Sequence, residues 1–379
     1  MSYYFTSESV CEGHPDKIAD KIADYILDAV IAKDENARCA VEVALTTNFC
    51  LIFGEVTANS TFDYAKLAKA AIKEIGYTDP KLMFSAEDIE YLVKIKTQSP
   101  DIALGVDKED QGAGDQGIMF GYAEDTTPEY LPPCIYFAHK LSRRLTEVRK
   151  QGIVKGLRPD GKTQVTAKFT DLGELKEITA IVVSAQHEPE IDLNELKKAI
   201  KTHVIKAIIP EHLITKNTQI FINATGRFVI GGPHGDSGLT GRKIIVDTYG
   251  GTAPHGGGAF SGKDPSKVDR SASYMARYLA KNIVAAKLAH RATIEISYCI
   301  GVAQPTSLFI TLDDGKNQEL EQKLFEFIKA NFNLSPKGII KKLNLKQPIY
   351  SKTAISGHFG NPEFPWEKLD SVSLFQKLL

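Results

Sequence analysis

The order helix, two-strand hairpin, helix occurs three times along this chain, and this recurrence restricts the possible folds more than any other feature. In the first unit, apolar residues recur at helical spacing over 15–30 and alternate with other residues over 41–46. A second strand is predicted over 49–57, followed by a helix over 62–75. Such a unit buries its apolar residues by packing helices on a hairpin.

The same order returns twice further along the chain. The second unit comprises a helix over 133–150, strands over 164–169 and 178–185, and a helix over 193–208. The third unit comprises a helix that starts at Asp264-Pro265, strands over 293–302 and 307–311, and a helix over 317–332. This order also arises by chance in proteins of mixed structure, but the similar spacing favours an internal repeat.

Short turns between the paired strands imply antiparallel sheets, which argues against a parallel Rossmann sheet. The length of 379 residues exceeds the size at which one hydrophobic core stops growing. We therefore predict an α+β fold of three similar domains with pseudo-threefold symmetry, each a small, mostly antiparallel sheet covered by helices. The predicted bounds are 1–100 for the N-terminal domain, 111–226 for the central domain and 227–379 for the C-terminal domain.

Composition excludes several classes of protein. The net charge of −1 argues against nucleic-acid binding through bulk charge, so the basic residues of any site must be concentrated locally. The five cysteines are scattered and form no C-x-x-C pair, which argues against a zinc site or a disulfide framework. Because neither a signal peptide nor a run of about 18 apolar residues is visible, we expect a cytoplasmic protein without membrane or nucleic-acid partners.

Two glycine-rich segments carry positive charge: GGPHGDSGLTGRK over 231–243 and HGGGAFSGKDPSKVDRS over 255–271. Glycine lets backbone amides approach an anion closely, and successive amides form a concave anion site. Glycine clusters are often simple turns. The basic residues Arg242, Lys243 and Lys263 nevertheless favour a site that binds a polyphosphate.

The second glycine-rich segment contains the beginning of a P-loop pattern, because Gly257 to Lys263 matches G-x-x-x-x-G-K. The next residue is Asp264 instead of the serine or threonine whose hydroxyl binds magnesium. A strand is predicted over 244–248, before the loop and not after it. These differences argue against a Walker-type NTPase.

A helix start near the N-terminus brings two polar residues to a position that favours anions. Pro15 suits the first helical position, so His14 lies at or beside the N-cap and Asp16 in the first turn. His14 could then donate to a phosphate oxygen, and Asp16 could hold magnesium. A capping histidine and an aspartate that complements the helix dipole are the simpler interpretation of these two residues alone.

Two glutamates of the first hairpin form a second candidate site. If the hairpin loop is Asn48-Phe49, Glu42 lies directly opposite Glu55, and like charges in that position destabilise a sheet. A cation or a ligand amine beside them would relieve the repulsion. A solvated hairpin face or a different register is the alternative. The irregular stretch 98–111 is predicted to be a lid over an active site, although long loops are often only connections.

Taken together, these segments resemble the S-adenosylmethionine synthetase family over nearly the whole chain. The signatures are GHPDK at 13–17, GAGDQG at 112–117 and GGGAFSGKD at 256–264, with supporting runs that begin at Thr225, Lys267 and Gly357. The resemblance implies the three-domain pseudo-threefold fold and the conversion of ATP and L-methionine to S-adenosylmethionine, phosphate and pyrophosphate. It also implies two Mg²⁺ ions per site, K⁺, and a homodimer or homotetramer with sites at the subunit interface.

The resemblance also assigns roles to individual residues. The implied ATP-binding residues are His14, Asp160, Gly161, Lys162, Arg227, Phe228, Asp236, Arg242, Lys243, Ala259 and Lys263. The implied catalytic residues among them are His14, Lys162, Arg242, Lys243 and Lys263. The implied methionine-binding residues are Glu55, Gln98, Asp115, Asp236 and Lys267, with Asp236 acting from the neighbouring subunit. The implied metal ligands are Asp16 and Asp269 for Mg²⁺ and Glu42 for K⁺.

The sequence departs from the family pattern in three places, and one of them, His234 and Ser237 in the segment that begins at Gly231, is expected to be tolerated. Gly161 stands where a bulkier small residue is expected between Asp160 and Lys162, which should loosen a turn there. The part of the lid between Gly105 and Gly112 is shorter than is usual in the family.

The proposed chemistry explains the abundance of cations. A thioether is a nucleophile without a proton to lose, so no general base is needed when methionine sulfur attacks C5′ of ATP. Catalysis must then come from aligning the sulfur with C5′ and from stabilising the departing triphosphate. The basic residues that bind the triphosphate could also orient a water molecule to split it. Another ATP-dependent kinase or ligase, or a nucleotide-binding regulatory protein without turnover, are the competing interpretations.

Overall fold

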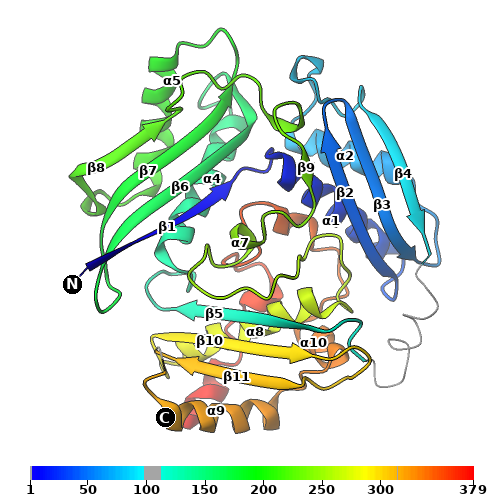
Figure 1. Ribbon diagram of the computed structural model, residues 1–379, viewed down its shortest axis with the longest axis vertical. Coiled ribbons are helices and arrows are strands. Elements are labelled where there is room, and N and C mark those ends of the chain that lie inside the picture. Colours follow the sequence, from blue (N-terminus) through cyan, green and yellow to red (C-terminus); the bar gives the residue numbers. More distant parts are fainter. Residues whose placement is uncertain (1, 98–111, 314) are drawn as a thin grey trace.

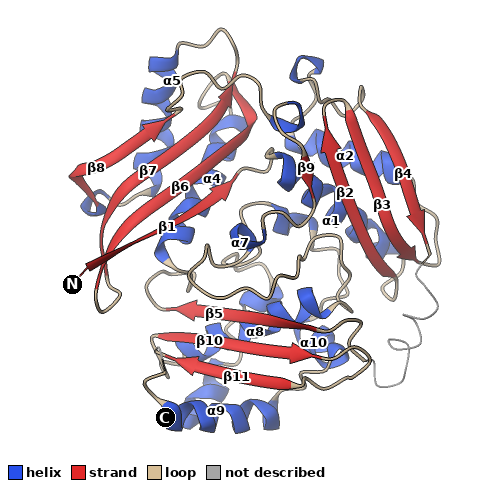
Figure 2. Cartoon of the chain, in the orientation of Figure 1, coloured by secondary structure: helices blue, strands red, loops and turns tan. Residues whose placement is uncertain are grey.

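Three β-sheets surround a central region that contains helices α1 (Pro15–Lys33) and α7 (Ile244–Asp247) (Figure 1). This arrangement comes from a computed structural model, which describes residues 2–97, 112–313 and 315–379. Helices pack against each of the three sheets (Figure 2). The predicted α+β class is therefore confirmed.

The first sheet has the strand order β4-β3-β2-β9 and is packed against α1 and α2 (Tyr64–Ile75). Its strands are β2 (Arg38–Thr46), β3 (Phe49–Thr57), β4 (Glu90–Lys96) and β9 (Gly238–Leu239). Strands β2 and β3 form the predicted antiparallel hairpin, whereas β3 and β4 pair in parallel. Alternate residues of β2 are buried, as the period of a half-buried strand requires.

The second sheet has the order β1-β6-β7-β8 and is packed against α4 (Pro133–Lys150). Its strands are β1 (Ser2–Val10), β6 (Leu157–Thr170), β7 (Leu175–His187) and β8 (Ile214–Ile222). The helical stretch after β7 comprises α5 (Leu193–Ile200), a π-helical turn (Lys201–Ile205) and α6 (Lys206–Ile208). This sheet has a hydrophobic core of its own, which includes Phe137, Leu141, Val165 and Ile181.

The third sheet has the order β11-β10-β5, with α8 (Val268–Ala285) packed on β5 and β10. Its strands are β5 (Gly117–Glu124), β10 (Arg291–Tyr298) and β11 (Ser307–Leu312). The remaining α-helices of the described chain are α9 (Gln318–Asn331), α10 (Pro336–Leu343) and α11 (Val372–Phe375). Helix α8 can lie close to β5 because a Cβ at Gly121 would come within 2.0 Å of the Ala276 carbonyl carbon.

The sheets exchange strands between consecutive thirds of the chain. Strand β1 precedes α1 in sequence but pairs along its whole length with β6 of the second sheet. Strand β5 precedes α4 but pairs with β10 of the third sheet. The bounds 1–100, 111–226 and 227–379 therefore describe stretches of chain, and as structural domains they stay a prediction.

Three local predictions are wrong. The first hairpin turns at Thr47-Asn48, with φ of +53° at Asn48, so Glu42 lies opposite Phe53 and Glu55 opposite Ala40. Residues 244–248 form the short helix α7 and its cap instead of a strand: the Asp247 N–H donates to the Lys243 carbonyl oxygen, and Val246 and Asp247 are buried while Ile245 is exposed. Helix α8 begins at Val268, since Asp264 uses its carboxylate to hold the preceding turn.

Candidate active site

The N-terminus of α1 orients His14. As the N-cap residue, it accepts a hydrogen bond from the Asp16 N–H at Nδ1 (3.2 Å), so the neutral ring carries its proton on Nε2. Burial, together with nearby Lys243 and Lys162, lowers the pKa of His14 to about 3. A buried, neutral hydrogen-bond donor thus lies where the dipole of a 19-residue helix favours negative charge.

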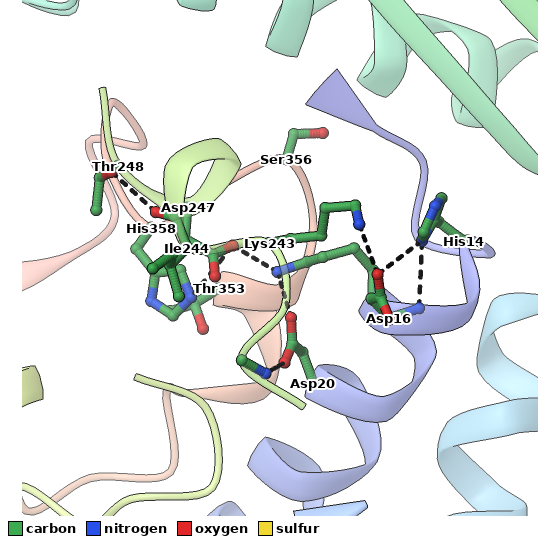
Figure 3. Close-up of polar contacts among 12 residues, drawn as sticks. His14, Asp16, Asp20, Lys243, Ile244, Asp247, Thr248, Thr353, Ser356 and His358 are labelled. Atoms are coloured by element: carbon green, nitrogen blue, oxygen red, sulfur yellow. Dashed lines mark hydrogen bonds and ion pairs between the residues drawn. The ribbon is translucent and has the colours of Figure 1, made fainter. Parts of the chain in front are cut away.

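Asp16 gathers the basic end of the first glycine-rich segment around it (Figure 3). Its Oδ2 lies 2.5 Å from Lys243 Nζ, its Oδ1 accepts the Leu239 N–H (3.0 Å), and Arg242 Nε lies 3.6 Å from Oδ1. Burial alone would raise the pKa of Asp16, but the hydrogen bonds from Lys243 and Leu239 outweigh burial and lower it. Asp16 is therefore an ionised carboxylate between two cationic side chains.

Four aspartates at intervals of four residues form a ladder along one face of α1. Each of them accepts hydrogen bonds from backbone amides of another segment. The pairs are Asp16 with Leu239, Asp20 with Gly241, Asp24 with Gly262, and Asp28 with Tyr350 and Ser351. One helix face therefore fixes both glycine-rich segments and the chain near residue 350. Asp20, Asp24 and Asp28 were not among the predicted site residues, although their four-residue spacing is apparent in the sequence.

The start of β6 approaches the α1 N-terminus. A Cβ at Gly13 would lie 2.4 Å from the Pro159 carbonyl oxygen, so glycine permits the contact that brings Asp160 and Lys162 beside His14. Asp160 Oδ2 accepts the Gly232 N–H (2.8 Å), and burial raises the pKa of Asp160 to about 6. Lys162 is exposed, and among the described residues it makes no ion pair.

Gly161 does not loosen a turn, contrary to expectation. It lies within β6, where a Cβ would come 2.9 Å from the Ser184 carbonyl oxygen and 3.1 Å from a methyl group of Leu145. The absence of a side chain therefore allows close packing between β6, β7 and α4. The backbone that carries Asp160 and Lys162 is held tightly as a result.

A second group of predicted residues lies around the start of α8 and the first hairpin. Lys263 Nζ pairs with Asp269 (2.7 Å), and Lys267 Nζ pairs with the buried Asp264 (2.5 Å). Burial raises the pKa of Glu42, which accepts a hydrogen bond from the Thr240 hydroxyl. The negative charge of Glu55 contributes to the raised pKa of Glu42, and Glu55 itself forms an ion pair with Lys96 (3.3 Å). Asp115 is exposed. Neither Glu55 nor Asp115 is therefore buried in the core.

The structure divides the predicted residues into these two groups. Within the described chain, no hydrogen bond or ion pair joins His14, Asp16, Asp160, Lys162, Arg242 or Lys243 to Glu42, Glu55, Lys263, Lys267 or Asp269. Arg227 and Asp236 are exposed. Phe228 exchanges two hydrogen bonds with His187, and Ala259 lies against Gly241, where the two glycine-rich segments meet. Gln98 and the predicted lid 98–111 lie outside the described residues.

The carboxylates suit magnesium held jointly with phosphate. Among the described residues, no three His, Cys, Asp or Glu side chains converge into a ready metal site. Asp16 and Asp269 are instead single carboxylates, each paired with a lysine. Because Mg²⁺ is usually bound through one or two carboxylates together with substrate phosphates, this donor set fits the ion.

Three mainly antiparallel sheets and a glycine-rich, basic segment beside a helix N-terminus define an α+β protein with a candidate anion-binding site. Three family models match consecutive stretches of the chain: the N-terminal domain of S-adenosylmethionine synthetase at 2–100, its central domain at 110–228 and its C-terminal domain at 230–368. The chain therefore belongs to the S-adenosylmethionine synthetase family, and it is an enzyme of the methionine adenosyltransferase class.

Curated relatives agree with this assignment. The chain is 53% identical to the S-adenosylmethionine synthase of Petrotoga mobilis over 388 residues, covering 97% of the chain and 96% of that protein. It is 54% identical to the S-adenosylmethionine synthase of Pseudothermotoga lettingae over 389 residues, covering 98% of both chains. The resemblance inferred from the sequence motifs is confirmed. None of the described helices is both long and apolar enough to span a bilayer.

Proposed function

We propose that the chain forms S-adenosylmethionine by attack of the methionine sulfur on C5′ of ATP and then hydrolyses the bound triphosphate to phosphate and pyrophosphate. The observation that carries this proposal is the group at the N-terminus of α1, where a neutral imidazole, a lysine without an ion pair among the described residues, and the Asp16–Lys243 pair converge. These groups suit a polyphosphate that gains negative charge as it departs.

Each residue that would bind ATP or its triphosphate has a defined contribution. His14 would donate from Nε2 to a phosphate oxygen, and the exposed Lys162 ammonium would approach the bridging oxygen next to C5′. Lys243 and Lys263 would turn from their aspartates toward phosphate. Mg²⁺ held by Asp16 and Asp269 would neutralise part of the triphosphate charge. Arg242 would add a further cation, while Asp160, Arg227, Phe228 and Ala259 would shape the nucleotide site.

The division into two groups supports a site shared between subunits. If each group forms one side of the active site, the group of one chain meets the other group of a second chain when two chains associate as a homodimer or as a dimer of dimers. Asp236 would then reach ligand bound mainly by the neighbouring subunit. Glu55, Gln98, Asp115 and Lys267 would hold methionine, and Glu42, whose raised pKa reflects burial near other carboxylates, would lie next to K⁺.

One assay tests the reaction. The purified chain is incubated with ATP, L-methionine, Mg²⁺ and K⁺, and products are separated by liquid chromatography and ³¹P NMR. We expect equal amounts of a sulfonium product, phosphate and pyrophosphate. Formation of ADP or AMP would indicate a kinase or a ligase instead, and absence of turnover by a folded protein would contradict the proposal.

Glu55→Gln should weaken methionine binding. The substitution removes the charge that would face the methionine amino group, while its size is unchanged. We expect the KM for methionine to rise about tenfold, equivalent to about 1.4 kcal/mol, with the KM for ATP little changed. Steady-state kinetics with each substrate varied would measure this. Glu90→Gln, an exposed substitution at the start of β4, is the matched control, and an unchanged methionine KM would remove Glu55 from the site.

Mixing two inactive variants should restore activity if sites are shared. Asp236→Ala and Lys162→Ala chains, unfolded together and refolded as a mixture, would form some mixed dimers with one intact site. We expect activity near one quarter of the wild-type value, since half of the randomly formed dimers would be mixed and each would have one of its two sites intact. Activity no higher than that of the separate variants would argue against shared sites.

A further inference from the structure

The part of the first glycine-rich segment that carries Arg242 and Lys243 is held at both ends by side chains of α1. At one end, Asp20 Oδ1 accepts the Gly241 N–H at 3.0 Å. At the other end, Asp247 Oδ1 accepts a hydrogen bond from Lys17 Nζ at 2.6 Å. The Asp247 N–H in turn donates to the Lys243 carbonyl oxygen (2.8 Å), so Asp247 is directly connected to the backbone of Lys243.

A single buried ammonium joins the two ends. Lys17 Nζ lies 3.0 Å from Asp20 Oδ2 as well as 2.6 Å from Asp247 Oδ1. The three side chains are at most 3% exposed, so water does not screen their attraction. We call Asp20, Lys17 and Asp247 the buried triad.

The C-terminal part of the chain closes over the far side of the triad (Figure 3). The His358 N–H donates to the Asp247 carbonyl oxygen (3.0 Å), and His358 Nε2 lies 3.8 Å from Asp247 Oδ1. The His358 ring is fixed through Nδ1, which lies 2.8 Å from the Tyr274 hydroxyl. Because Asp247 is enclosed by protein, it acts on a bound phosphate only through the segment that it holds.

We propose that Asp20 and Asp247, joined by Lys17, are positioning residues of the reaction, which fix the backbone of Gly241–Lys243 so that the Lys243 ammonium meets the phosphate chain at a set place. This inference rests on the proposed function. Charges that are already in place stabilise a departing anion without reorganisation during the reaction. A displacement of about 1 Å in such a group can lower a rate about 100-fold.

Asp247→Asn in the full chain tests the inference. The amide keeps an oxygen for Lys17 but loses the charge, and Asp20, 3.0 Å from Lys17 Nζ, still neutralises the ammonium. We expect kcat to fall about 10- to 100-fold. We expect the KM for methionine to stay within a factor of two, because Glu55 and Lys267, two of the proposed methionine residues, lie in the other group. Should this variant not fold, Asp20→Asn tests the opposite end with the same expected split.

Two further measurements separate positioning from general destabilisation. Glu367→Gln alters a different buried ion pair, with Arg277 and Lys281, and should lower Tm while leaving kcat well below Tm unchanged. In a Lys243→Ala background, Asp247→Asn should cost less than about threefold in kcat, because the residue that it positions is already gone.

The outcomes are distinguishable. An unchanged kcat in both Asp247→Asn and Asp20→Asn, an equal fold loss with and without Lys243, or a matching kcat loss in Glu367→Gln would each overturn the inference and leave the proposed function standing. Failure of the unmodified chain to form the sulfonium product would instead contradict the proposed function.

Discussion

Lys162→Ala should lower kcat about 10²- to 10³-fold, the usual cost of removing one group that stabilises charge developing in a transition state. Lys162 is exposed on β6 beside His14, and it makes no ion pair among the described residues, so its ammonium is available to a ligand. Because the charge on the bridging oxygen appears only as the bond to C5′ breaks, ATP affinity should change by less than about fivefold. Rapid-quench measurement of sulfonium formation, combined with equilibrium binding of ATP, separates the two quantities.

Lys168→Ala is the matched control for that experiment. Lys168 lies on the same strand and the same side of the sheet as Lys162, and its closest carboxylate is Glu177 at 4.0 Å. We expect its loss to leave both kcat and ATP affinity unchanged. An equal loss of affinity and of rate in Lys162→Ala would show that Lys162 binds ATP without favouring the transition state.

Asp24→Asn should lower the free energy of unfolding by several kcal/mol. Both carboxylate oxygens of Asp24 contact the Arg270 guanidinium, at 2.7 and 2.6 Å, and both side chains are fully buried. Removing one partner of such a pair leaves an uncompensated buried charge, which costs about 3–5 kcal/mol. Because Asp24 also accepts the Gly262 N–H, the second glycine-rich segment should loosen at the same time.

Urea denaturation followed by circular dichroism would measure this loss, at equal protein concentration for each variant. Glu319→Gln removes one partner of the exposed Lys323 pair and serves as the control, with a midpoint expected to match that of the unmodified chain. A midpoint for Asp24→Asn that is indistinguishable from the control would show that the buried pair contributes little to stability.

Local patterns predicted the hairpins and helices well because each depends on neighbouring residues. The apolar period and Pro15 place the start of α1, and the structure finds the helix at Pro15–Lys33. Helix α4 begins and ends at the predicted residues. Alternation identified β2 and β3, but it could not fix the register. A shift of the turn by one residue changes every cross-strand neighbour, and the turn conformation at Asn48 decides that shift.

For the candidate site, the sequence predicted the residue types but not their protonation states. The residue types at His14, Lys243 and Lys263 indicated anion chemistry from the sequence alone, and the resemblance to the family supplied individual roles. The neutral state of His14 follows from burial and from two lysines that are distant in sequence. No local pattern reports that environment, because burial is a property of the folded chain.

By itself, the sequence determined the repeated helix–hairpin–helix order, the glycine-rich basic segments and the family to which the chain belongs, since these reside in spacing and residue type. Only the tertiary structure decided which strands share a sheet: β1 and β5 each cross into the sheet of another third of the chain. It also decided that the aspartates of α1 hold backbone amides from residues 239 to 351. Such long-range contacts depend on which buried groups must find hydrogen-bond partners once water is excluded, and that selection is made only when the whole chain folds.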